Sequence, residues 1–364
     1  MDILDPTATH TVQDVFGYDV FYLWASGFLA RHGQDVYDQN ALASLMYQLG
    51  WPSDEYAHAV LTPPWALWLW AILSLIPFSA ARVAWPCIIA AASAIILTRI
   101  QGLLAPHHKK KSNAAALVLV LLFPWYWSNI YWGQYNFLLL LTLLGASLLL
   151  LQQRLFWAGV VLSLSLCKPN LFMGVYAYLL GATAHNKSVA LIGGAIAGGS
   201  LQLLLGEALV PGITLSFLRH GTFDSGFSLP GASLSQVFRS LWGGNLSLLL
   251  PTIGCLVAFS YGLRTRFSTK NFLQVIVPLS LTIAPYMWSH SLVLLFPTYC
   301  SIAEYLTKIV RRYVYHLLLL GLALSMPFLF FAWYERWYAA VPLLALAWGH
   351  LSSRGSPHVI PDQQ

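Results

Sequence analysis

The stretch YNFLLLLTLLGASLLLLQ (135–152) contains no charged residue. A helix needs about 20 mainly apolar residues to cross the hydrocarbon core of a bilayer, so this stretch predicts a membrane helix. Several of the other apolar runs are shorter than a full crossing, so we expect broken or re-entrant helices and about ten to twelve membrane segments in total. The other runs lie at about 63–78, 82–104, 114–128, 155–167, 169–184, 188–210, 241–263, 272–287, 289–307, 313–332 and 336–350.

The composition supports an all-α, polytopic membrane protein. Of the 364 residues, 58% are hydrophobic and 9% are charged, and the mean hydropathy is +0.64. A soluble domain has about 25% charged residues, so this chain has too little charge to cover a globular surface. The 15 Trp and 18 Tyr residues match the aromatic belts found at membrane surfaces.

Three regions differ in composition. Residues 1–56 are polar and aromatic, and we expect an external loop whose amphipathic helix, YDVFYLWASGFLARHG (18–33), lies along the bilayer surface. Residues 57–352 form the predicted transmembrane helical domain, which contains a polar external loop at 211–240. Residues 353–364 are expected to be a disordered tail.

Short basic loops predict the orientation of the chain. The positive-inside rule makes these loops cytoplasmic and places the alternate loops, including 211–240, on the opposite face. The rule leaves the side of residues 1–56 open, because 63–78 and 82–104 can count as one crossing or as two. The net charge of +6 comes mostly from these loops, so we expect membrane lipids and no nucleic acid as partners. The basic loops are HHKKK (107–111), Arg154, HNK (185–187), RTRFSTK (264–270) and KIVRR (308–312).

The sequence gives no sign of a cofactor or a resident metal. The four cysteines stand apart in apolar runs, without a CxxC or Cys/His cluster. No nucleotide-binding glycine-rich motif occurs, and no cluster of carboxylates suggests an obligatory divalent ion. We therefore expect no cofactor and metal-independent chemistry.

The carboxylates are concentrated before Tyr56, and the next one after this segment is Glu207. Asp19, at the head of the predicted helix 18–33, has two interpretations. It can act as a first-turn residue that the helix dipole favours, or as a general base that takes a proton from a hydroxyl group. The competing early carboxylates are Asp14, Asp35, Asp38, Asp54 and Glu55.

Cationic residues form a second candidate group, on the face that the positive-inside rule places opposite the basic loops. Lys168, between two apolar runs, either extends to the membrane surface or binds a phosphate. Arg219 and His220 add positive charge there, and together these three side chains could hold a lipid-linked phosphate. His290 is either a hydrogen-bonded interfacial residue, or a proton carrier or anion ligand near the outer surface.

Polar and aromatic side chains complete the candidate site. Gln134 and Asn136, in WGQYN (132–136), begin a Leu-rich helix. They serve either as a helix cap within an aromatic belt, or as contacts to a sugar or headgroup.

Five segments in order resemble glycosyltransferase family 87, whose members are polyprenol-phosphate-sugar-dependent enzymes of GT-C architecture and include α-mannosyltransferases. The segments are YDVFYLWASGFLARHGQDVYD (18–38), TPPWALWLW (62–70), WGQYNFLLLLTLL (132–144), GVVLSLSLCKPNLFMGVYAYLL (159–180) and APYMWSHSLVLLFP (284–297).

The resemblance implies roles for several residues. Asp19 corresponds to the catalytic Asp of the first external loop, and His290 becomes an active-site residue. Lys168 and Gln134 match the family's KP and GQ positions. Tyr22 and Trp288, which lie in the matching segments, are expected to bind substrate together with Gln134 and Asn136. The resemblance also places residues 1–56 outside.

These observations lead us to expect an integral, multi-pass glycosyltransferase of the bacterial inner membrane, with its site on the periplasmic face. It would transfer a sugar from a polyprenyl-phosphate donor to a glycolipid or cell-envelope glycan by an inverting mechanism, and mannose is the expected sugar. A transporter or a flippase for lipid-linked glycans is the alternative, since it needs the same hydropathy and no chemistry. A non-catalytic subunit of an envelope complex is a third.

Overall fold

A computed structural model of the chain describes residues 17–51, 62–104, 124–186, 189–220, 233–242, 244–265, 271–285, 287, 289–301 and 340–354. Within these ranges all regular structure is helical and no strand occurs. The predicted all-α fold is therefore confirmed for the described part of the chain. The expected tail at 353–364 falls almost entirely outside it, as do the apolar run at 313–332 and most of the run at 114–128.

The helices follow the apolar runs closely, with breaks where the runs are short. In chain order they are α1 (Tyr18–Arg31), α2 (Gln39–Gln48), η2 (Pro64–Ala66), α3 (Leu67–Leu73), α4 (Phe78–Leu104), α6 (Pro124–Trp132), α7 (Asn136–Leu151), α8 (Leu155–Ser163), η3 (Leu164–Cys167), α9 (Pro169–Asn186), α10 (Val189–Leu209), α11 (Ile213–His220), α13 (Leu234–Trp242), α14 (Gly244–Arg264), η4 (Phe272–Ile276), α16 (Val277–Ile283), η5 (Ser289–Leu295) and α19 (Ala340–Arg354).

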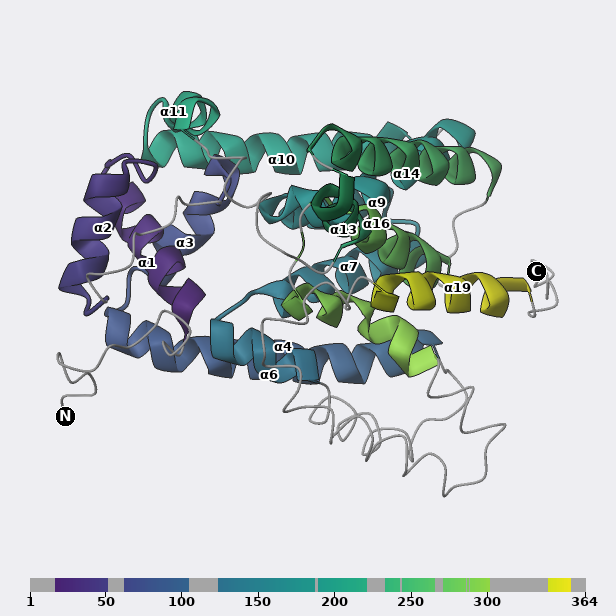
Figure 1. The fold of residues 1–364 in the computed structure, drawn as a ribbon, viewed down its shortest axis with the longest axis horizontal. Coiled ribbons are helices and arrows are strands. Elements are labelled where there is room, and N and C mark those ends of the chain that lie inside the picture. The colour runs from purple at the N-terminus through teal and green to yellow at the C-terminus, as the bar shows by residue number, and fades with distance from the viewer. Residues whose placement is uncertain are drawn as a thin grey trace, which may run out of the picture.

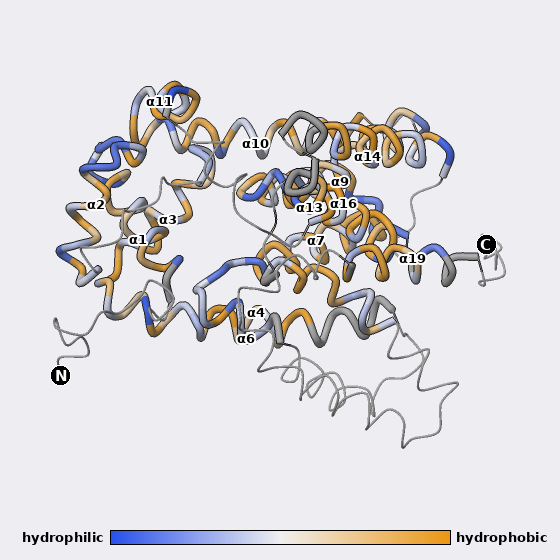
Figure 2. Tube along the Cα trace, viewed as in Figure 1, coloured by the Kyte–Doolittle hydropathy of each residue, from blue (hydrophilic) through white to orange (hydrophobic). Residues whose placement is uncertain are grey.

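Most of the long helices run along the long axis of the molecule. α4 and α10 lie on opposite sides of it, and α14 and α19 occupy the end that holds the C-terminus (Figure 1). α1, α2, α3 and α11 gather at the other end. Polar residues are frequent in the tube around α2 and α11, whereas α10 and α14 are mainly apolar (Figure 2).

Helix α1 forms where the sequence predicts a helix, but it does not have one apolar face and one open face. Phe21 and Leu29 are buried as well as Val20, Leu23 and Trp24. Four helices, α2, α3, α4 and α6, contact α1 and cover most of its sides. Burial on most sides differs from the single buried face that the sequence predicted for α1, whereas its place along the bilayer surface stays a prediction.

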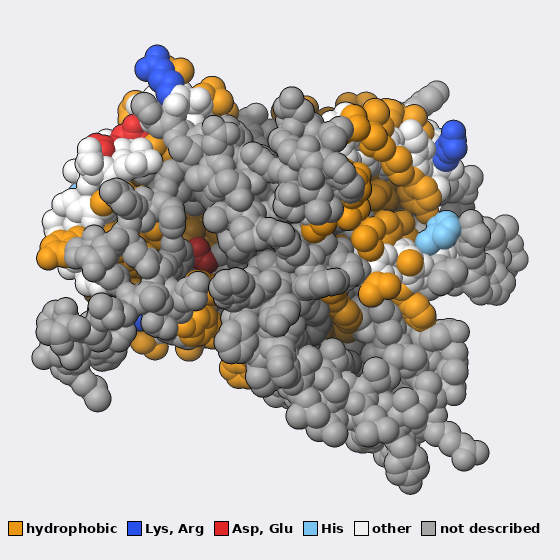
Figure 3. All heavy atoms as spheres, viewed as in Figure 1, with side chains coloured by type: hydrophobic (Ala, Val, Ile, Leu, Met, Phe, Trp, Pro, Cys, Tyr) orange, Lys and Arg blue, Asp and Glu red, His pale blue; other side chains and the backbone are white. Residues whose placement is uncertain are grey.

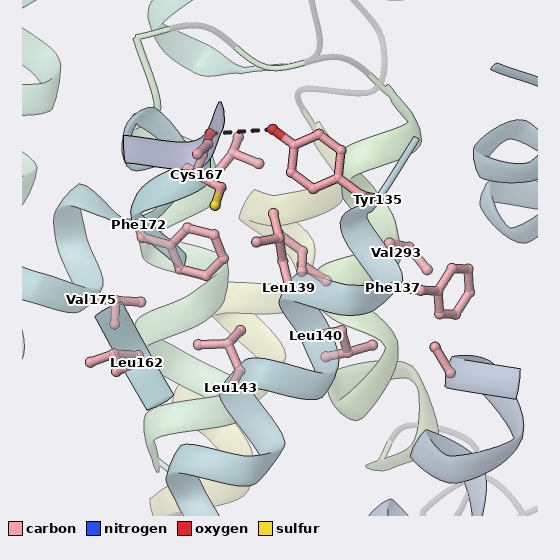
Figure 4. Packing of buried hydrophobic residues seen from close by; sticks show 14 of the residues in the cluster. Tyr135, Phe137, Leu139, Leu140, Leu143, Leu162, Cys167, Phe172, Val175 and Val293 are labelled. Carbon is pink, nitrogen blue, oxygen red and sulfur yellow. Dashed lines mark hydrogen bonds between the residues drawn. The ribbon is translucent and has the colours of Figure 1, made fainter. Parts of the chain in front are cut away.

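The core lies on both sides of α7. Leu139 and Leu143 of α7 point toward Phe172 and Val175 of α9, while Phe137 lies on the side of Val293 (Figure 4). All these side chains are almost fully buried. These side chains belong to one core, and the elements that lie closest to α7 are α8, α4 and η5.

Two described helices are long and apolar enough to cross a membrane, over Phe78–Ile96 of α4 and Val189–Leu209 of α10. Several others are shorter apolar helices of 10–17 residues, so ten to twelve crossings stay a prediction. Leu201 and Leu204 of α10 are exposed, as are Leu256 and Val257 of α14, and hydrophobic side chains dominate the visible surface over α14 (Figure 3). Such a surface suits a lipid environment.

Glycines allow α8 and α10 to touch backbone to backbone. A Cβ placed on Gly194 of α10 would lie 1.9 Å from the carbonyl oxygen of Phe156 in α8. A Cβ on Gly159 of α8 would lie 2.1 Å from the carbonyl oxygen of Leu191. These distances leave no room for a methyl group. Gly193, the neighbour of Gly194, has nothing within 4 Å of its Cβ position.

We predict that Gly194→Ala destabilises the protein, whereas Gly193→Ala does not. Forcing a methyl group into closely packed helices costs about 1–3 kcal/mol, while Ala is favoured over Gly in an open helical position by up to about 1 kcal/mol. Thermal unfolding of both variants in one detergent measures the difference. Equal melting temperatures for the two would contradict the α8–α10 contact.

Candidate active site

The link between α6 and α7 is held in place by α1 and α4. Gly133 adopts φ +74°, a left-handed conformation that glycine accepts most readily. The backbone N–H of Gly17 donates to the carbonyl oxygen of Tyr131 (2.7 Å), and Trp85 Nε1 of α4 donates to the carbonyl oxygen of Gly133 (2.7 Å). The start of α1 is therefore bonded to the segment that carries Gln134.

A chain of hydrogen bonds runs from the first turn of α1 to α6. Gln134 Nε2 donates to Asp19 Oδ2, and Gln134 Oε1 accepts from Lys168 Nζ. Lys168 Nζ also donates to Asn136 Oδ1 (3.1 Å). Asn136 Nδ2 then donates to Asn129 Oδ1 (3.0 Å). We call these five residues the Asp19–Lys168 cluster.

The break between α8 and α9 directs Lys168 into the cluster. The chain narrows into the 3₁₀-helix η3, and Lys168 follows it. The next residue, Pro169, disfavours helical geometry in Lys168. Lys168 accordingly has φ −133° and ψ 69°. Its Nζ lies 4.5 Å from the centroid of the Tyr135 ring, within the range of a cation–π contact. Tyr135 Oη donates to the carbonyl oxygen of Cys167 (3.2 Å; Figure 4).

Burial changes the ionisation of Asp19 and Lys168, which both lie outside the two candidate membrane spans. Loss of water raises the pKa of Asp19 to about 6, although the charge of Lys168 and the Gln134 hydrogen bond oppose the shift. Loss of water lowers the pKa of Lys168 to about 8, and the charge of Asp19 opposes this. Near neutral pH the cluster therefore holds a carboxylate and an ammonium group, and the carboxylate can accept a proton.

The other described early carboxylates have different partners. Asp38 caps α2 by accepting from the N–H of Asn40 (2.9 Å). Asp35 accepts from Ser216 Oγ and from the N–H of Tyr37 (2.9 Å). Asp19 is the early carboxylate that these described ranges place beside a lysine. Asp14, Asp54 and Glu55 lie outside them.

The remaining predicted site residues are less closely joined to the cluster. Tyr22 lies on α1, with its ring centroid 5.6 Å from that of Trp51. Arg219 is exposed on α11, at the α2 end of the molecule (Figure 1). The backbone of His290 lies in η5, which packs against α6 and α7. His220 ends α11. The side chains of both histidines, and Trp288, are outside the described part.

Sequence reasoning missed two members of the site's surroundings, Asn129 and Tyr135. Asn129 is fully buried and Tyr135 is nearly so. A buried asparagine needs hydrogen-bond partners, and Asn129 stands seven residues before Asn136, in the same polar-aromatic stretch. The stretch WSNIYWGQYN (127–136) was therefore the sequence feature that could have pointed to Asn129. The partner of Asn129 becomes visible only once α6 and α7 are placed.

We predict that Gly133→Ala destabilises the site more than Gly33→Ala destabilises its own turn. Both glycines have positive φ, +74° and +68° respectively, so both substitutions carry a strain of about 1–2 kcal/mol. A Cβ on Gly133 would also lie 2.5 Å from Val20 Cγ2, whereas one on Gly33 meets nothing within 4 Å. Thermal unfolding measures the two losses. Equal losses would mean that the contact with α1 does not constrain the link.

Within the described ranges, no three His, Cys, Asp or Glu side chains group as metal ligands. A comparison with protein families matches residues 61–263 to glycosyltransferase family 87. The matched region contains Gln134, Asn136 and Lys168. Asp19 lies before it, and the hydrogen bond to Gln134 joins Asp19 to it. No curated protein and no solved structure gave a significant match.

Proposed function

Because the chain belongs to glycosyltransferase family 87, we propose that it transfers a sugar from a polyprenyl-phosphate donor to a glycolipid or cell-envelope glycan. Mannose is the proposed sugar. The observation that carries this proposal is the Asp19–Lys168 cluster, in which a carboxylate is held ready to accept a proton.

We further propose a multi-pass protein of the bacterial inner membrane with its site on the periplasmic face. Members of the family are membrane proteins, and two described helices could cross a bilayer. The basic loops that the sequence places in the cytoplasm support the proposed side, because positive residues favour that side of a membrane.

The proposed reaction is a single displacement with inversion. The Asp19 carboxylate takes the proton of an acceptor hydroxyl group. The hydroxyl oxygen then forms a bond to the anomeric carbon on the face opposite the phosphate. The bond between that carbon and the phosphate oxygen breaks, and its electron pair leaves with the polyprenyl phosphate. A general base working from the opposite face is the logic of inverting sugar chemistry.

The leaving phosphate is already anionic, so it needs stabilising positive charge more than protonation. We propose Arg219 and His220 as its ligands and His290 as an active-site residue. Lys168 adds a positive charge, although its ammonium group already contacts the amide oxygens of Gln134 and Asn136. Tyr22 and Trp288 are proposed to contact the substrates.

We predict that Asp19→Asn lowers sugar transfer by about 10²–10⁴-fold, the usual contribution of a positioned base. The assay follows radiolabel from polyprenyl-phosphate mannose into total envelope lipid, with the protein in nanodiscs. Asp38→Asn is the matched control, because Asn caps a helix as well as Asp does. This control should keep its activity.

An Asp19→Asn variant that keeps more than about a tenth of the wild-type rate would contradict the role of Asp19 as the base. Absence of transfer by folded wild-type protein, with mannose and with other polyprenyl-linked sugars, would favour the transporter or the subunit.

We also predict a bell-shaped dependence of kcat/KM on pH. The pKa of Asp19 is raised, so its base form is lost as the pH falls through about 6. The pKa of Lys168 is lowered, so its positive charge is lost as the pH rises through about 8. The rate should be highest between these values. A rate that stays constant from about pH 7 down to about pH 4, the ordinary range of an Asp side chain, would contradict the raised pKa.

A further inference from the structure

The Lys168 ammonium group contacts side chains of its own protein. An ammonium group has three N–H donors and no acceptor. The amide oxygens of Gln134 and Asn136 accept from it, and the ring face of Tyr135 lies beside it. A ligand that exists to bind phosphate would direct its donors toward open space, whereas Lys168 directs them at groups of its own fold.

Gln134 can join Lys168 to Asp19 in only one orientation. Its side chain carries one oxygen that accepts and one NH₂ group that donates. The oxygen faces the ammonium group and the NH₂ group faces the carboxylate. Rotating the amide by half a turn would place donor against donor and acceptor against acceptor. The two charged groups therefore fix the amide, and the amide fixes the position of Asp19 Oδ2.

We infer that Lys168 is a positioning residue, which acts through Gln134 to hold the Asp19 carboxylate charged and correctly oriented, rather than a ligand of the donor phosphate. The inference rests on the proposed function, because it takes Asp19 to be the base. It changes the role that the sequence suggested for Lys168, and it extends the site to Asn136 and Asn129, which hold Lys168 from the other side.

Asn129 ties both amides of the cluster to α6. Its side-chain oxygen accepts from Asn136 Nδ2 (3.0 Å), and its backbone oxygen accepts from the N–H of Gln134 (2.8 Å). Both Asn129 and Asn136 are fully buried. Because buried amides in a fully satisfied network hold one geometry, Lys168 has little freedom to turn toward a ligand.

The charge of Lys168 also supports its role as a positioning residue. Against the loss of water, this charge lowers the pKa of Asp19, while Asp19 and the Cys167 thiol raise the pKa of Lys168. Of the neighbouring elements, α4 contributes Arg82, whose guanidinium group lies over the Phe21 ring. α6 and the link to α7 contribute the phenols of Tyr126, Tyr131 and Tyr135, and η5 contributes His290, whose side chain is outside the described part. Asp19 and Lys168 are both partly buried, and removing one of two such charges leaves the other without its partner.

The experiment is an infrared titration of Asp19 in purified protein in nanodiscs. A protonated carboxyl group has its own C=O band, and the part of this band that Asp19→Asn removes reports Asp19. Lys168→Met should move the midpoint of that band upward by about 1–3 pH units, the effect of losing a close opposite charge. Lys168→Arg should restore part of the shift. Arg264→Met, which removes an exposed cation from the far end of α14, should leave the midpoint unchanged.

An unchanged midpoint in Lys168→Met would overturn the inference. Should that variant fail to fold, Gln134→Met replaces it, because it cuts the link while Lys168 stays in place. The midpoint should again rise, and a midpoint equal to that of the wild type would again overturn the inference.

Binding of a short-chain polyprenyl phosphate separates the two roles of Lys168. The Kd of Lys168→Met should stay within about threefold of the wild-type value, whereas loss of a charge-assisted phosphate contact costs about tenfold or more. A tenfold weaker Kd with an unchanged infrared midpoint would make Lys168 a phosphate ligand. Neither readout needs sugar transfer, so a failure of the proposed function in the transfer assay is distinguishable from a failure of this inference.

Discussion

The Gln134 amide joins a carboxylate to an ammonium group in a chain in which 9% of the residues are charged. Ionised groups away from water are costly unless they are paired and hydrogen-bonded. This requirement brings together three segments that are far apart in the chain: the start of α1, the link between α6 and α7, and the break between α8 and α9. The rest of the described structure keeps these segments in register.

Close helix packing supplies that register. α7 packs against α8, and α8 meets α10 at glycines that leave no space for a side chain. Because Asn136 begins α7 and Lys168 stands directly before α9, a shift between these helices would separate their side chains. The apolar packing and the polar cluster therefore depend on each other. The outer faces of α10 and α14 remain apolar, as a lipid environment requires.

Much of the helical structure could be predicted from the sequence, because apolar runs bounded by polar or basic residues mark helices directly. The runs 135–152 and 188–210 match α7 and α10 to within one or two residues. Changes of helix type within the shorter runs were harder to predict. Residue propensities do not show where a helix narrows to a 3₁₀-helix, as at η3, or widens to a π-helix, as at η4. The helix predicted at 18–33 is buried on more sides than its periodicity indicates, because α2, α3, α4 and α6 all contact α1.

The candidate site was predictable in its membership more than in its contacts. Gln134, Asn136 and Lys168 were singled out as polar residues at the edges of apolar runs, and Asp19 as a carboxylate at the head of a predicted helix; the structure brings these four together. Which atoms meet depends on pairs 115 residues apart, such as Asp19 and Gln134, and no local pattern reports such a pair. For the same reason Asn129 was missed, and the sequence did not predict that Lys168 contacts the amides of Gln134 and Asn136.

We propose that a polyprenyl-linked sugar reacts at the Asp19–Lys168 cluster. A cryo-EM structure of the Asp19→Asn variant in nanodiscs with bound polyprenyl-phosphate mannose tests it most directly. We expect the sugar beside residue 19, with its anomeric carbon facing that residue across the space for an acceptor hydroxyl group, and with the phosphate on the far side of the sugar. A sugar bound elsewhere, with the cluster closed off from it by protein, would contradict this role of the cluster.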